Sequence, residues 1–139
     1  MSIVQTQTTS FKAELYQGIH DLTTDVIKIA LYNGNASLNA DTTVYSTSNE
    51  VTGTGYSAGG KTMTGITVNT SGYTAYVGFD NVTWSPGVFT ARCALIYNSS
   101  KGNKSVAVLD FGSDKTTTST FTITMPANTA SAALIRSSI

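Results

Sequence analysis

The spacing of hydrophobic positions along the chain changes once, near residue 25. Before it, Phe11, Leu15 and Ile19 recur at every fourth position, the spacing of one face of a helix. Thr9 or Ser10 can cap the start of that helix, and Gly18 favours an early end. The pattern therefore predicts one short α-helix over about residues 10–18, packed on a sheet.

After residue 25 the apolar positions alternate with a period of two. Ile27, Ile29 and Leu31 share one side of residues 25–32, which predicts a half-buried strand. Further strands are predicted at 61–69, 73–79, 82–84, 89–98, 105–111, 116–125 and 130–136. Short strands at fairly even spacing are typical of all-β domains. The predicted fold class is mainly β: a single-domain antiparallel β-sandwich or partly closed barrel with one short N-terminal α-helix.

Two segments fall outside this alternation. Residues 1–9 form a polar N-terminal arm, and residues 10–139 form the single β-rich domain. Within that domain, residues 39–60 make a long polar loop whose glycines, including Gly53, Gly55 and Gly59, suit turns with positive φ. Loops of this length are commonly functional or ordered by a partner. We expect the arm and the loop to contact neighbouring subunits.

Composition narrows the classes of function. A chain of 139 residues fits one domain, and its charged residues make up only 12%, about half the usual share. Threonine (24), serine (16) and asparagine (9) take their place. A net charge of zero argues against nucleic-acid binding, which needs a basic excess. No apolar run is long enough to span a membrane, and the N-terminus has no basic region typical of a signal peptide.

The residues able to carry chemistry are few. His20 could act as a base with Asp21, but neighbouring side chains on an extended chain point in opposite directions. Cys93 lies on an apolar strand, which favours a small buried side chain over a reactive thiol. Three aspartates could hold calcium, although their spacing matches no EF-hand loop: Asp80, Asp110 and Asp114. We expect no enzymatic activity, no catalytic or metal-binding residues and no cofactor.

The tyrosines are more informative. Four of the seven lie in or near the polar, glycine-rich stretch: Tyr45, Tyr56, Tyr73 and Tyr76. Tyrosine is enriched at interfaces because it buries a large area at low entropic cost and keeps a polar tip. These residues are the candidate interface, and the alternative interpretation is ordinary half-buried strand tyrosine.

Several stretches together resemble the small virion structural proteins of tailed bacteriophages. They are residues 11–20, 27–33, 42–60, 94–98 and 106–112, and the most specific block is 49–56 (NEVTGTGY). The resemblance covers nearly the whole chain and implies a component of the phage particle without giving its position. It brings no catalytic residues.

Among such proteins, a capsid decoration (cement) protein on the head surface is favoured. It would be made in the cytoplasm of the host bacterium and would bind the major capsid protein or other virion proteins. Because shells present three-fold sites, we expect a homotrimer, with no nucleic-acid or membrane partner. The alternatives are a tail, neck or fibre accessory protein, and a carbohydrate-binding module on the virion that stacks sugars on Tyr56, Tyr73 and Trp84. A hydrolase that uses His20 is the enzymatic alternative.

Overall fold

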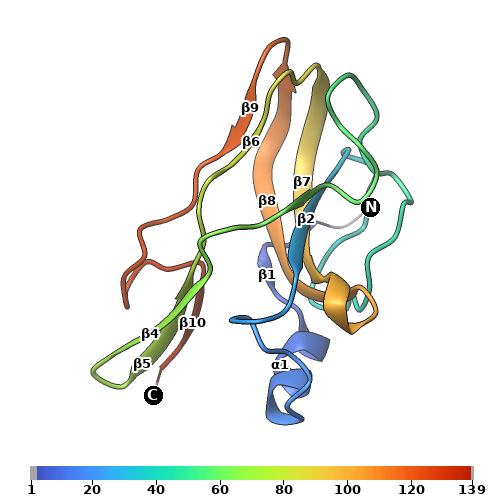
Figure 1. The fold of residues 1–139 in the computed structure, drawn as a ribbon. Coiled ribbons are helices and arrows are strands. Elements are labelled where there is room, and N and C mark those ends of the chain that lie inside the picture. Colours follow the sequence, from blue (N-terminus) through green and yellow to red (C-terminus); the bar gives the residue numbers. More distant parts are fainter. Residues whose placement is uncertain (1–2, 139) are drawn as a thin grey trace.

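The computed structural model describes residues 3–138 of the chain, drawn in Figure 1. In chain order the elements are β1 (Thr6–Gln7), α1 (Thr9–Tyr16), β2 (Ile27–Tyr32), β3 (Lys61–Thr62), β4 (Thr67–Ser71), β5 (Thr74–Gly78), β6 (Val82–Trp84), β7 (Phe89–Asn98), the 3-10 helix η1 (Ser99–Lys101), β8 (Lys104–Thr117), β9 (Phe121–Ile123) and β10 (Ile135–Ser137). The predicted class, a mainly β single-domain sandwich with one short helix near the N-terminus, is confirmed.

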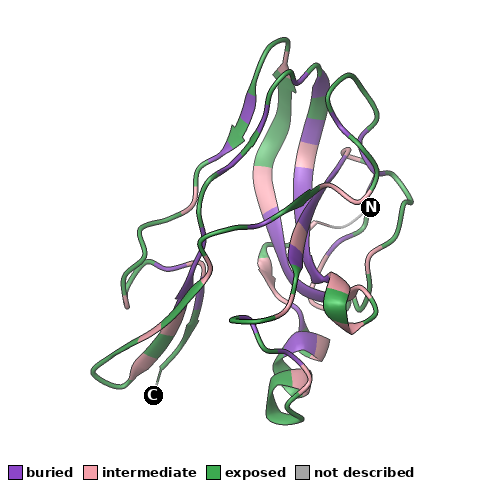
Figure 2. Cartoon of the chain, in the orientation of Figure 1, coloured by how far each residue is buried: buried purple, intermediate pink, exposed green. Residues whose placement is uncertain are grey.

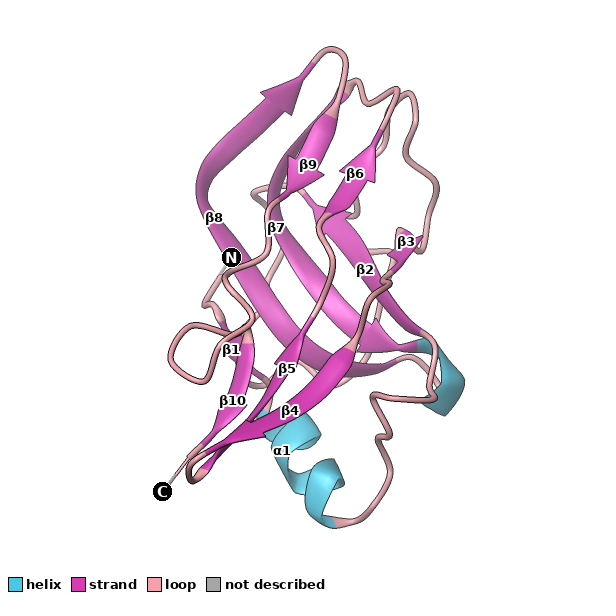
Figure 3. Cartoon of the chain, turned by 60° about the vertical axis from the view of Figure 1, so that its left-hand side comes forward, coloured by secondary structure: helices cyan, strands magenta, loops and turns pink. Residues whose placement is uncertain are grey.

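The strands form two layers. One layer is a five-stranded antiparallel sheet in the order β1-β8-β7-β2-β3, with the long β7–β8 hairpin at its centre. The second layer consists of two smaller antiparallel sheets, β6-β9 and β10-β5-β4 (Figures 1 and 3). The hairpin of β4 and β5 extends away from the rest of the second layer, on the same side as α1 (Figure 3).

The five-stranded sheet is covered on both faces. The main core lies between the two layers and includes Ile29, Trp84 and Ile96. A second cluster, which includes Tyr32 and Leu95, lies on the opposite face, under the loop of residues 33–60. The half-buried strand predicted at 25–32 is therefore wrong in its burial: β2 is buried on both sides, because the polar loop covers its outer face (Figure 2).

The helix is shorter than predicted and begins differently. Thr8, rather than Thr9 or Ser10, is the N-cap, and its hydroxyl accepts a hydrogen bond from the Phe11 backbone N–H at 3.3 Å. Only Phe11 of the predicted apolar face is fully buried. Leu15 is 39% exposed, and Ile19 lies beyond the end of the helix at Tyr16. The predicted stop near Gly18, which has a positive φ, is confirmed.

Two predicted strands are each divided in the structure. The strand predicted at 61–69 is split into β3 and β4, with Gly65 at positive φ between them. The strand predicted at 116–125 is interrupted by a turn at 118–120, where the Thr117 hydroxyl donates to the Thr120 carbonyl at 2.8 Å. Threonine favours strands, but its hydroxyl can also stabilise a turn, and here the turn prevails. The last strand lies at the end of the predicted 130–136 range, as β10.

Residues 3–8 of the predicted arm lie against the domain itself. Ile3 forms a bridge with Leu38, and β1 pairs with β8 through Thr6 and Gln7. The Thr8 hydroxyl lies 2.9 Å from that of Ser105 on β8. Residues 1 and 2 of that prediction lie outside the described residues. Deletion of residues 1–9 would therefore remove β1 and the cap of α1 together.

Two glycines allow the polar loop to lie close to the sheet. At Gly55 (φ 87°) an added Cβ would lie 1.7 Å from the carbonyl oxygen of Pro86. At Gly60 (φ 77°) it would lie 1.8 Å from that of Ile29. Both positions therefore require glycine for conformation and for space. The predicted positive φ is confirmed at Gly55 and Gly59 and is wrong at Gly53.

Candidate interaction surface

A buried carboxylate holds the polar loop together. The side chain of Glu50, which is only 9% exposed, accepts hydrogen bonds from the hydroxyls of Tyr45 (2.6 Å) and Tyr56 (2.5 Å) and from the Gly59 backbone N–H (2.8 Å). The Tyr56 oxygen also accepts from the Leu31 backbone N–H at 2.9 Å, which links the cluster to β2. We call Glu50 and its three donors the Glu50 cluster. A buried carboxylate is stable only when it is hydrogen-bonded in this way.

Two further tyrosines fix the loop to the sheet. The Tyr32 hydroxyl donates to the Ser46 carbonyl at 2.6 Å, and the Tyr97 hydroxyl donates to the Gly59 carbonyl at 2.6 Å. The ring of Tyr97 also stacks on that of Tyr45, with ring centroids 4.6 Å apart. The loop is thus ordered by contacts within its own chain.

These tyrosines remain neutral donors. Burial, followed by the hydrogen bond to Glu50, raises the pKa of Tyr45 and of Tyr56 well above the usual value. Burial and then the charge of Glu50 raise the pKa of Tyr32 strongly and that of Tyr97 to about 12. The cluster therefore contains protonated phenols that donate hydrogen bonds to one carboxylate, an arrangement that stabilises the loop.

The four candidate interface tyrosines separate into two groups. Tyr45 and Tyr56 belong to the Glu50 cluster, and Tyr56 is too buried to meet a partner. Tyr73, by contrast, is 82% exposed at the tip of the β4–β5 hairpin. Tyr76 lies half-buried on β5. Tyr45 is half-buried as well, so the interface stays a prediction for Tyr45, Tyr73 and Tyr76. The sequence pattern did not reveal the role of Glu50, although Glu50 is the one acidic residue in a long uncharged stretch.

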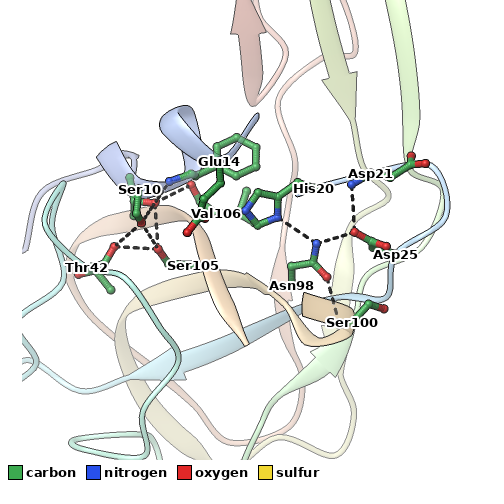
Figure 4. A network of polar contacts seen from close by, with 12 residues as sticks. Ser10, Glu14, His20, Asp21, Asp25, Thr42, Asn98, Ser100, Ser105 and Val106 are labelled. Carbon is green, nitrogen blue, oxygen red and sulfur yellow. Dashed lines mark hydrogen bonds and ion pairs between the residues drawn. The ribbon is translucent and has the colours of Figure 1, made fainter. Parts of the chain in front are cut away.

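The only histidine belongs to a structural network, shown in Figure 4. Asn98 donates from Nδ2 to Nδ1 of His20 at 3.0 Å, so the His20 proton is on Nε2 and is donated to Glu14 at 2.8 Å. The Asn98 amide orientation is fixed because its Oδ1 accepts from the Ser100 N–H at 3.1 Å. Asp21, considered from the sequence as the partner of His20 in a catalytic base, forms no hydrogen bond with His20 among residues 3–138.

The same network continues to an ion pair. Asp25 accepts from Asn98 at 2.7 Å and from Lys101 at 2.8 Å. Burial would raise the pKa of Asp25, but these hydrogen bonds and the lysine charge outweigh it and lower the pKa to about 2. The network joins α1, residues 17–26 and the end of β7. His20 has a fully buried side chain and, within the described chain, no hydroxyl or thiol among its hydrogen-bond partners.

Cys93 and two of the three candidate aspartates are also engaged in the fold. Cys93 is fully buried, as predicted, and burial raises the pKa of its thiol to about 12. Asp110 forms an ion pair with Arg92, whereas Asp80 accepts from the Thr64 hydroxyl. Within residues 3–138 there is no group of three or more side chains placed to hold a metal ion.

The surface of the small sheet β10-β5-β4 offers different chemistry. β4 is exposed or half-buried along its whole length, and its residues are threonine, valine, asparagine and serine. Between β4 and the end of α1 lies a hollow of about 450 Å³, lined by Leu15, Val68 and Val77 among others. Tyr16, 94% exposed, is at the end of the same helix. This part of the molecule combines exposed apolar groups with neutral hydrogen-bonding groups.

Comparisons with protein-family models, with curated proteins and with solved structures gave no match to this chain. Across the described residues, no helix combines the length and the apolar character needed to cross a bilayer.

Proposed function

We propose that the chain is a non-enzymatic structural protein of a tailed-phage virion that decorates the assembled head as a cement protein. The observation that carries the proposal is that the fold buries the side chains with reactive potential and exposes neutral polar ones. The groups with reactive potential, Glu50, His20 and Cys93, are buried and held by the fold. The exposed strand β4 carries neutral hydroxyl and amide groups. The sequence resemblance to small virion proteins supports the same role.

A neutral surface of this kind suits a protein that binds between other proteins. Threonine, serine and asparagine lose less hydration energy than lysine or glutamate when they enter an interface. They also offer many hydrogen-bond donors and acceptors. A cement protein that binds the assembled shell and not its separate subunits stabilises the shell by mass action. On a shell with three-fold sites, a homotrimer fits this role.

The carbohydrate-binding alternative and the tail or neck alternative receive less support from the exposure of the side chains. Of the three aromatic residues considered for sugar stacking, Tyr56 and Trp84 are buried, and Tyr73 alone is exposed. A tail or neck location has no observation in its favour beyond the resemblance, which applies to it equally.

The test is to locate and count the protein on particles of the phage that encodes it. Electron cryo-microscopy should place it on the head, and quantitative mass spectrometry should give hundreds of copies per particle. A dozen copies or fewer, or density at the neck or tail, would exclude the cement role and favour the accessory role. Absence from mature particles would exclude both.

The contact surface can be tested with particles that lack the protein. Purified protein should restore resistance to heat, and Tyr73→Ala should reduce the amount bound. Thr118→Ala is the matched control, because Thr118 is also exposed but lies in the turn between β8 and β9. Equal binding by both variants would remove the β4–β5 hairpin from the contact.

A further inference from the structure

The outer edge of β4 lacks the usual protection of an edge strand. Natural proteins block such edges with charged residues, proline or bulges, because an open edge can pair with another chain. The hairpin of residues 67–78 (TVNTSGYTAYVG) contains no charged residue and no proline. The register between β4 and β5 is continuous from Thr67 to Ser71, without a bulge.

The backbone groups that face outward can be assigned from the hairpin. Ser71 pairs with Thr74 across a two-residue loop, so this pair is hydrogen-bonded and alternate residues of β4 face β5. Val68 and Thr70 therefore direct their N–H and C=O groups away from the sheet. Within residues 3–138 those groups have no hydrogen-bonding partner.

The other sheet edges are better closed. The outer edge of β8 is covered by β1, and its next free N–H, at Asp110, donates to the side chain of Gln5. Beyond it, the pairing of β8 with β7 shifts register, and Gly112 has a positive φ. β3 has only two residues and begins with Lys61, whereas β10 carries Arg136. The two strands of the β6-β9 sheet are uncharged but have only three residues each. The β4 edge is thus the longest regular edge without charge in the part of the chain that the structure describes.

The sequence of β4 is complementary to itself in the antiparallel direction. With Asn69 opposite Asn69 of a second copy, Val68 lies opposite Thr70 and Thr67 lies opposite Ser71. In this register the outward groups of Val68 meet those of Thr70, which is the alternation that an antiparallel ladder requires. The side-chain pairs are two hydroxyls, two β-branched residues and two amides, and no like charges meet.

The inner face of β4 provides apolar area for the same contact. Val68 continues the row of Val77 and Ile135 across the small sheet, but it is 50% exposed at the open edge. A strand added beside β4 would cover Val68 and narrow the hollow between β4 and Leu15.

We propose that two copies of this chain pair through their β4 strands, antiparallel and centred on Asn69, to form one continuous sheet. The contact is isologous and closes with two copies, so it differs from the contacts of a cyclic trimer and, on a shell, would join copies across a two-fold axis. The inference goes beyond the proposed function, because it concerns the chain in solution and would hold in another role.

The test is self-association of the purified chain, measured by sedimentation equilibrium over a series of concentrations. The wild-type chain should form dimers. Asn69→Lys and Asn69→Asp place like charges opposite each other on the two-fold axis, and each should weaken dimerisation by about fivefold or more. An equimolar mixture of the two variants should restore it, because lysine then lies opposite aspartate.

Thr118→Lys, which adds the same charge in the turn after β8, is the control and should leave dimerisation unchanged. Thr70→Pro should also weaken the dimer, because it removes an outward N–H without affecting the β4–β5 ladder. Circular dichroism verifies that each variant is folded. A chain that stays monomeric at millimolar concentration, a dimer insensitive to Asn69, or a mixture that does not recover would overturn the proposal. None of these outcomes bears on where the protein lies on phage particles. That location is the separate test of the proposed function.

Discussion

At the scale of single residues, the structure uses its few ionisable groups as hydrogen-bond centres. Glu50 collects three donors from the polar loop, and His20 joins Glu14 to Asn98. Each group adds hydrogen bonds to the apolar contacts that hold its segment against the sheet. At these two positions a charged or titratable side chain orders neighbouring segments of the chain.

Replacement of Glu50 tests the first of these centres. In Glu50→Gln one carboxylate oxygen becomes an NH2 group, so the donors lose a charged acceptor and the group that faced this oxygen can no longer donate to it. We expect the free energy of unfolding to fall by about 2 kcal/mol or more. Urea denaturation at neutral pH measures it, and Asp41→Asn in the same loop is the control, since Asp41 is exposed. Equal stability of the two variants would show that the Glu50 cluster does not hold the loop.

Acid stability tests the ion pair at the end of the His20 network. The pKa of Asp25 is about 2 in the folded chain against an ordinary 3.8, so its ionised form stabilises the fold above pH 4. This contribution should decline as the pH falls from about 4 to about 2. Thermal unfolding at a series of pH values should show a smaller loss between these limits for Asp25→Asn than for the wild type. Identical pH profiles would contradict the assigned role of Asp25.

At the scale of elements, the sequence predicts strands well where alternation is strong. The bounds predicted for β6 and β7 agree with the structure, because each has apolar residues fixed by the core, such as Trp84 and Leu95. The burial of β2 on both faces was not predictable from its own hydrophobic pattern, because the loop that covers it has no regular spacing of hydrophobic residues. The Glu50 cluster was missed for a related reason: its members come from separate segments, and only the fold brings them together.

The glycines of the polar loop provide a test at this scale. Gly55→Ala forces a side chain against the Pro86 carbonyl at a positive φ, so the loop must leave the sheet. We expect a loss of more than about 2 kcal/mol in unfolding free energy. Gly72→Ala is the matched control: its φ is also positive, but nothing lies within 4 Å of the new Cβ, and the expected cost is about 1 kcal/mol. Denaturant unfolding of both variants compares them, and equal losses would refute close approach as the reason for Gly55.

At the scale of the whole molecule, burial is distributed unevenly between the layers. The five-stranded sheet has a core on each face, whereas the sheet of β4, β5 and β10 is covered on one face only and ends in an open edge (Figure 2). A segment covered on both faces opens to solvent only when much of the molecule unfolds, whereas an edge strand opens locally. The stability of the chain should therefore vary from strand to strand.

Amide hydrogen exchange measures this variation directly. The backbone amides of β2 and of residues 94–96 in β7 should exchange slowest, at rates set by global unfolding. Those of Val68 and Thr70 should exchange fastest among strand residues in dilute solution, because they face outward from β4. At concentrations where copies associate, these two amides should become protected while that of Asn69, which faces β5, changes less. Uniform protection across both layers would contradict the unequal cores, and unchanged exchange at Val68 and Thr70 in the dimer would show that the copies meet elsewhere.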